Sequence, residues 1–84
     1  IYWNYRDYEP EESESMALRL EKASGYAAIK LTGSDAGYKD WFIHKFRRPG
    51  FTVEAGWGVN PLPIEQFQDI YDELLPLMTE GLVL

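Results

Sequence analysis

The sequence predicts an α/β fold, in which strands and helices alternate along the chain. Short aromatic or branched runs, typical of strands, are separated by longer stretches whose apolar residues recur at helical spacing. Glycine and proline stand between these stretches, as they do at turns. The predicted order is β-α-β-α-β-α, and such alternation favours right-handed crossovers and a mostly parallel sheet.

The first part of the chain contains two predicted strands and the helix between them. Residues 1–5 (IYWNY) and 26–32 (YAAIKLT) are the strands, because both are short and carry aromatic or branched side chains. The helix covers residues 11–24, where apolar side chains recur every three or four positions. Gly25 is expected to end this helix in the left-handed conformation.

The second part contains two further helices and a third strand. A helix is predicted over residues 38–46, with its aromatic side chains on one face, and a strand over residues 51–55. The last helix covers residues 63–80, and Pro76 is expected to kink or split it because proline lacks a backbone N–H. Three parallel strands leave faces and edges uncovered, so residues 1–84 are expected to be the C-terminal part of a larger α/β/α sandwich.

The composition excludes several classes of function. A net charge of −6 argues against nonspecific nucleic-acid binding, which needs a basic surface. The chain has no cysteine and one histidine, His44, so we expect it to supply no metal site of the usual catalytic zinc type. No apolar run is long enough to predict a membrane span.

Glu54 is the first candidate for a functional side chain. It lies in the predicted buried strand FTVEA, where an apolar residue is expected, and the ends of strands collect sites in α/β folds. Two interpretations are open for this carboxylate. It carries chemistry, or it forms a structural ion pair with Arg47 or Arg48.

Further candidates lie around the helix predicted at residues 38–46. Asp40 fits a first-turn acid that the helix dipole favours. Lys39, beside Tyr38, would meet a substrate carboxylate if the preceding loop lines a pocket; otherwise it is a surface lysine. His44 is expected on the solvated face of the helix.

Residues 39–56 (KDWFIHKFRRPGFTVEAG) resemble the C-terminal segment of the M14 zinc carboxypeptidases, the carboxypeptidase A-like family. Residues 40–41 (DW) are similar to the Asp-Trp after the family's substrate-covering loop, and residues 51–54 (FTVE) to its Phe-Thr-Phe-Glu strand. Residues 60–63 (NPLP) resemble the loop before its last helix. Within the family, the sequence resembles most the bacterial branch that cleaves γ-D-glutamyl-diamino acid bonds in peptidoglycan peptides.

The resemblance implies that Glu54 is the general base and acid of a zinc peptidase. It would take a proton from a zinc-bound water and deliver it to the leaving amine. The family's zinc ligands, a His-x-x-Glu pair and a later His, would lie before Ile1, a non-methionine start that itself suggests a fragment. Zinc would therefore be a cofactor of the full-length protein only, and residues 1–84 would be inactive alone.

The resemblance also implies substrate-binding positions. Thr32 aligns with the mobile Tyr of carboxypeptidase A-like members, a departure that weakens an ordinary C-terminal carboxypeptidase mechanism. Lys39 aligns with the residue that helps set side-chain preference in the digestive enzymes. A cation there, next to Tyr38, would suit an acidic group such as the extra carboxylate of meso-diaminopimelate.

The implied partners are the N-terminal remainder of the same catalytic domain and a peptide substrate. A fragment of this kind should expose apolar surface and self-associate. Bacterial cytoplasm and cell envelope are both compatible compartments. Two alternatives stay open: a small acidic α/β interaction module without catalysis, and a glycosidase-like carboxylate pair of Asp40 and Glu54.

Overall fold

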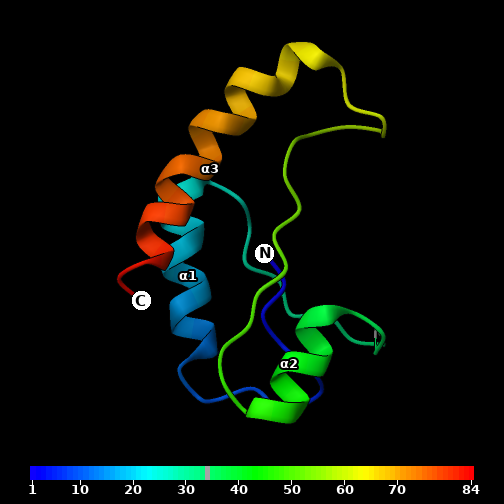
Figure 1. Ribbon diagram of the computed structural model, residues 1–84, viewed down its shortest axis with the longest axis vertical. Helices are drawn as coiled ribbons and strands as arrows, with labels where there is room; N and C mark the ends of the chain where they lie inside the picture. Colours follow the sequence, from blue (N-terminus) through cyan, green and yellow to red (C-terminus); the bar gives the residue numbers. More distant parts are fainter. Residues whose placement is uncertain (34) are drawn as a thin grey trace.

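Helices carry the regular structure of the computed structural model, which describes residues 1–33 and 35–84 (Figure 1). The elements are α1 (Ser13–Ser24), α2 (Tyr38–Phe46), the 3-10 turn η1 (Ile64–Gln66) and α3 (Phe67–Gly81). The predicted helices are confirmed, although the first begins two residues later than expected and the last, predicted over residues 63–80, starts as a 3-10 turn and is α-helical only from Phe67. None of the helices in the described part of the chain is long and apolar enough to cross a membrane.

α1 ends as its sequence predicts. Gly25 has φ +83°, in the left-handed region, and its N–H donates to the carbonyl of Glu21 at 2.8 Å. Ala17 and Leu20 are buried on the inner face of the helix, 0% and 3% exposed. Arg19, on another face, forms an ion pair with Glu80 of α3 at 2.7 Å.

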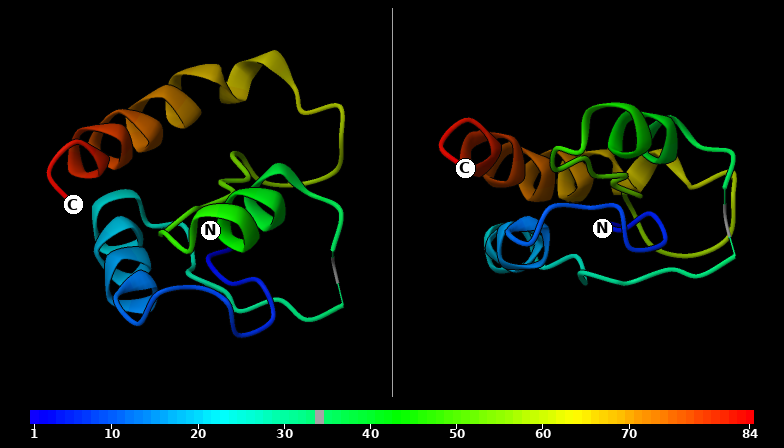
Figure 2. Two further views of the ribbon diagram at one scale, coloured as in Figure 1. Left: turned by 60° about the horizontal axis from the view of Figure 1, so that its bottom comes forward. Right: turned by 90° about the horizontal axis from the view of Figure 1, so that it is seen from below.

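α3 lies beside α1 along its C-terminal half, while its N-terminal half extends away from α1 (Figures 1 and 2). The helix runs through Pro76 without being split. Leu77 is buried with Ile1, Leu20 and Tyr26 in one core cluster. This cluster joins the two helices to the start of the chain.

The predicted α/β fold with a mostly parallel sheet, as part of an α/β/α sandwich, is wrong. The described residues contain isolated β-bridges, each one residue long, and form no continuous β-strand. Tyr2 forms a parallel bridge with Ile29 and an antiparallel bridge with Thr52, with backbone N···O distances of 2.9 and 3.0 Å in the second. Three extended segments therefore meet at Tyr2, but each pairing is one residue long and one runs antiparallel.

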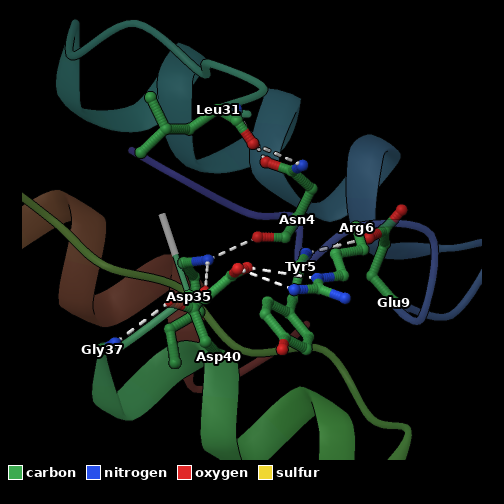
Figure 3. A network of polar contacts seen from close by, with 9 residues as sticks. Asn4, Tyr5, Arg6, Glu9, Leu31, Asp35, Gly37 and Asp40 are labelled. Carbon is green, nitrogen blue, oxygen red and sulfur yellow. Dashed lines mark hydrogen bonds and ion pairs between the residues drawn. The ribbon is translucent and has the colours of Figure 1, made fainter. Parts of the chain in front are cut away.

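Asn4 explains part of this difference. Its side chain accepts from the N–H of Leu31 at 2.7 Å and donates to the Leu31 carbonyl at 2.8 Å, where a sheet would use backbone groups (Figure 3). Two residues later, Arg6 has φ +53° and turns the chain. β-Favouring composition describes residues that suit a half-buried pleated surface, and it does not by itself provide the neighbouring strands.

The molecule is thin, with extents of 38 × 27 × 16 Å. A helix with its side chains is about 10 Å across. The thinnest dimension of the molecule therefore holds less than two full layers of helix. The core is correspondingly small: the buried apolar side chains of the described residues are seven, Ile1, Trp3, Ala17, Leu20, Tyr26, Ile43 and Leu77. Many large apolar side chains of α2 and α3 stay exposed.

Candidate active site

Glu54 lies on the open side of an extended segment, residues 51–55. Phe51, Val53 and Ala55 pack against the core, while Thr52 and Glu54 are exposed. The predicted alternation of faces is confirmed, but the predicted burial of Glu54 is wrong. The reason is that no second layer of the described chain covers this side.

Two shallow hollows meet at Glu54. One, of about 150 Å³, includes Tyr26 and Trp57 in its lining. The other, of about 170 Å³, includes Lys39 and Asp40. The described residues form four ion pairs, and none of them includes Glu54. The structural ion pair with an arginine is therefore not formed, and the carboxylate is open to solvent between the hollows.

Lys39 is buried, 8% exposed, and its charge is satisfied inside the molecule. Its Nζ lies 2.5 Å from Oδ1 of Asp40 and donates to the carbonyl of Asn4. The surface alternative for this lysine is therefore wrong. A substrate carboxylate approaching Nζ would have to compete with both of these acceptors.

Asp40 is 3% exposed and uses both carboxylate oxygens. Oδ1 meets Lys39, and Oδ2 accepts from the N–H of Gly37 at 3.1 Å, just before α2 (Figure 3). That second contact stabilises the first turn of the helix, as an acidic side chain at this position does. A glycosidase-like pair with Glu54 would need a free carboxyl group, and Asp40 has none to offer.

Tyr38 and Thr32 lie in other hollows than Glu54. Tyr38 is 78% exposed and lines a space of about 290 Å³ with Phe42 and Phe51. Thr32 is exposed and lines a space of about 330 Å³ that also contains Arg6 and Asp35. Of the predicted substrate-binding residues, the structure brings only Lys39 into a hollow with Glu54.

Arg6 and Asp35, which line the same hollow as Thr32, form an exposed ion pair with each other. Figure 3 shows this pair. The guanidinium donates to Oδ2 at 2.7 Å and to Oδ1 at 3.2 Å. This hydrogen bonding, together with the charge of Arg6, lowers the pKa of Asp35. Asp35 in turn raises the pKa of Arg6 through the same hydrogen bonds, so both side chains are charged at neutral pH.

His44 is exposed, as expected, and is absent from the lining of both hollows at Glu54. Its ring lies edge-on to Tyr5 and Tyr8, with centroid distances of 6.0 and 5.3 Å. Residues 1–33 and 35–84 contain no group of three or more His, Asp or Glu side chains placed to hold a metal ion. The side chains described therefore do not fit a zinc site on their own.

Three residues at the site were missed by sequence reasoning. Asn4 links the first segment to Leu31 and Lys39, and Trp57 lines a hollow with Glu54. The side chain of Gln66 forms two hydrogen bonds with the backbone of Trp57. Asn4 was the detectable one, because asparagine is disfavoured in strands and interrupts the run IYWNY.

Comparison with known proteins finds two relatives. The chain is 52% identical over 84 residues to "Gamma-D-glutamyl-L-diamino acid endopeptidase 1" of Lysinibacillus sphaericus, a match that covers 100% of this chain and 21% of that protein. It is 47% identical over 74 residues to "Uncharacterized protein YqgT" of Bacillus subtilis (strain 168), covering 86% of this chain and 20% of that protein. The chain thus spans about a fifth of the length of these curated relatives.

No family model matches the chain, and no solved structure matches it. The similarity to an enzyme of the γ-D-glutamyl-diamino acid endopeptidase type agrees with the branch named from residues 39–56. Membership of the M14 family stays a prediction.

Proposed function

We propose that the chain is the C-terminal segment of a zinc metallopeptidase domain of the M14 family, which hydrolyses a γ-D-glutamyl-diamino acid bond of peptidoglycan-type peptides. The observation that carries the proposal is the 52% identity over all 84 residues to an endopeptidase named for that bond. The resemblance of residues 39–56 to the family supports it. The exposed position of Glu54 between two hollows is compatible with a role in catalysis.

In this proposal Glu54 is the general base and then the general acid. Amide hydrolysis needs a proton taken from the attacking water and a proton given to the leaving amine, and one carboxylate can carry out both transfers. Because Glu54 is exposed and free of ion pairs among the described residues, water and substrate can reach it. Zinc, held by residues outside this chain, would supply Lewis-acid assistance in the full-length protein.

The remainder of the same polypeptide is the proposed partner of the chain. α3 carries an apolar stripe on one face, made of Phe67, Tyr71, Leu75 and Met78, which are between 52% and 65% exposed. These residues are spaced three or four apart and therefore share one side of the helix. Since the curated relatives are about five times as long as the matched stretch, their remaining length can provide the surface that covers the stripe.

α2 also exposes apolar side chains that the remainder of the polypeptide can cover. Tyr38, Trp41 and Phe46 are 78%, 49% and 47% exposed. The ring of Trp41 contacts the other two, with centroid distances of 5.5 Å to Tyr38 and 5.6 Å to Phe46. Clusters of exposed aromatic side chains are typical of surfaces that bind another protein surface. We place these residues, too, in the contact with the remainder of the domain.

The test of the catalytic role is Glu54→Gln in the full-length protein. We expect kcat for a γ-D-glutamyl-diamino acid peptide to fall by about 10²- to 10⁴-fold, the usual contribution of a general base. Bound zinc, measured by elemental analysis, should stay unchanged. Glu65→Gln is the matched control, because Glu65 is exposed and absent from the lining of both hollows.

Two results would contradict the proposal. One is a Glu54→Gln variant that keeps the activity of the parent protein. The other is a gene that encodes no His-x-x-Glu motif upstream of this chain. Either result would favour the alternative, a small acidic interaction module without catalysis.

A further inference from the structure

The hollow on the Trp57 side of Glu54 has a chemistry of its own. Glu54, Trp57, Tyr26 and Tyr2 line it together with aliphatic groups such as Ile29. Among the described residues that line it, none is Lys, Arg or His. Its walls are therefore aromatic and aliphatic, with the carboxylate of Glu54. The terminal amino group of Ile1 also lies here and donates to the Ala27 carbonyl at 2.7 Å. In the longer protein of the proposed function this nitrogen belongs to a peptide bond and carries no charge.

Trp57 is held in place and yet presents its ring. Its N–H donates to Oε1 of Gln66 at 3.1 Å, and its carbonyl accepts from Nε2 of the same side chain at 2.7 Å. The indole Nε1–H donates to Oε2 of Glu73 at 3.2 Å. Despite these contacts the residue is 59% exposed. The ring is thus a fixed wall with a free surface.

Tyr26 and Gly56 set the spacing between Trp57 and Glu54. Tyr26 is 3% exposed, its ring centroid lies 5.6 Å from that of Trp57, and its hydroxyl accepts from the Gly56 N–H at 3.3 Å. Gly56 has φ +85°, and a Cβ added there would lie 2.3 Å from Cδ1 of Leu62. The turn between the carboxylate and the indole therefore requires glycine and is tightly packed.

We propose that this hollow binds an alkylammonium group. The faces of tryptophan and tyrosine rings attract cations, and the carboxylate supplies the opposite charge. Methylene groups next to the ammonium fit the aromatic and aliphatic walls. The hollow on the other side of Glu54 contains the Lys39–Asp40 ion pair, so the two hollows offer a ligand different groups.

In the substrate, this group belongs to the amine half of the cleaved peptide, an assignment that rests on the proposed function. The binding of an ammonium group by the hollow is measured separately from the activity on a substrate. Trp57 then contributes to specificity, because it favours an amine-bearing side chain over an uncharged side chain of the same length.

The experiment follows the indole N–H signals of the full-length protein labelled with ¹⁵N at tryptophan. Trp57→Phe identifies the signal of Trp57, and Trp41, 49% exposed on α2, serves as the internal control. We expect n-butylammonium to shift the Trp57 signal in a saturable way, whereas 1-butanol and butyrate leave it unchanged. Trp57→Leu should weaken the binding about threefold or more, the usual size of an exposed cation–π contact. Glu54→Gln should also weaken it by about threefold, because it removes the opposite charge at an exposed site.

A shift of equal size with 1-butanol, or no shift at any n-butylammonium concentration, would overturn the inference. A second readout uses activity on two substrates that differ only in an ammonium or a methyl group at the end of the side chain. Trp57→Leu should reduce the preference for the ammonium substrate, and Trp57→Phe should retain part of it. If the protein hydrolyses neither substrate but the indole signal still responds, the proposed function fails and the ammonium site stands.

Discussion

α1 and α3 bury their apolar side chains to very different extents. In α1 the apolar face is covered, with Ala17 and Leu20 buried, and the other sides are largely polar. α3 buries Leu77 on one face and leaves the apolar stripe exposed on another. Since each 100 Å² of buried apolar surface contributes about 2.5 kcal/mol, the stripe represents stabilisation that this chain does not realise by itself. The apolar face of α1 is covered within the described chain, whereas the stripe of α3 is exposed and, in our proposal, packs against the remainder of the domain.

α2 shows the same contrast within one helix. Its inner face carries Lys39, Asp40 and Ile43, all buried, and its outer face carries exposed aromatic residues. A buried ion pair next to a solvated aromatic face reverses the usual distribution. In our proposal, the exposed aromatic face of α2 is covered by the remainder of the domain.

The two faces of α3 can be separated by alanine substitution. Leu77→Ala should lower the free energy of unfolding by about 3 kcal/mol, because it opens a cavity in a small core. Leu75→Ala, on the stripe, should change it by less than about 0.5 kcal/mol in the 84-residue chain. Urea denaturation followed by circular dichroism, at a protein concentration low enough for the chain to be monomeric, measures both. Equal losses would show that the stripe is already covered, and the comparison would fail.

For α2 we expect a smaller difference in stability between substitutions on its two faces. Lys39→Met keeps the aliphatic stem but leaves Asp40 without its cation, which should cost about 2 kcal/mol of stability. Tyr38→Ala, on the exposed face, should cost less than about 0.5 kcal/mol. The same denaturation experiment tests the pair. A larger loss for Tyr38→Ala would mean that the outer face of α2 packs on something in solution.

The stripe of α3 also predicts the association state of the 84-residue chain. We expect concentration-dependent self-association, since an exposed apolar helix face lowers its free energy by pairing. Met78→Glu should shift the average mass measured by light scattering toward the monomer. Leu18→Glu, at an exposed apolar position of α1 that is 49% accessible, is the matched control and should leave the mass unchanged. A monomeric parent chain at high concentration would contradict this.

The smallest expected effect concerns pH. Arg6 lowers the pKa of Asp35 in the folded chain, so the pair stabilises the fold above the unfolded-state pKa of about 3.9. That contribution is lost as the pH falls through the lower, folded-state value. Asp35→Asn should therefore melt slightly below the parent at neutral pH, and the gap in Tm should close toward about pH 2. A gap that is independent of pH would mean that the ion pair contributes nothing.

The helices could be predicted from the sequence because their determinants are local. Apolar spacing, Gly25 as a stop and the acidic start of α2 operate within a few residues, and α2 has the predicted bounds. The alternation of residues 51–55 was predictable for the same reason. Glu54 also stood out by its residue type alone, as an acid in an apolar run.

Only the tertiary structure decided how the extended segments pair and what each side chain meets. Strand pairing depends on residues that are distant in the sequence. Here Tyr2 pairs with Ile29 on one side and with Thr52 on the other, and the Asn4 side chain, in place of a backbone group, forms the hydrogen bonds to Leu31. The burial of Lys39 and the exposure of Glu54 follow from which face of each segment the thin core covers. Residue identity determined that a carboxylate stands at position 54; the absence of a covering layer in the described chain decided that this carboxylate is open.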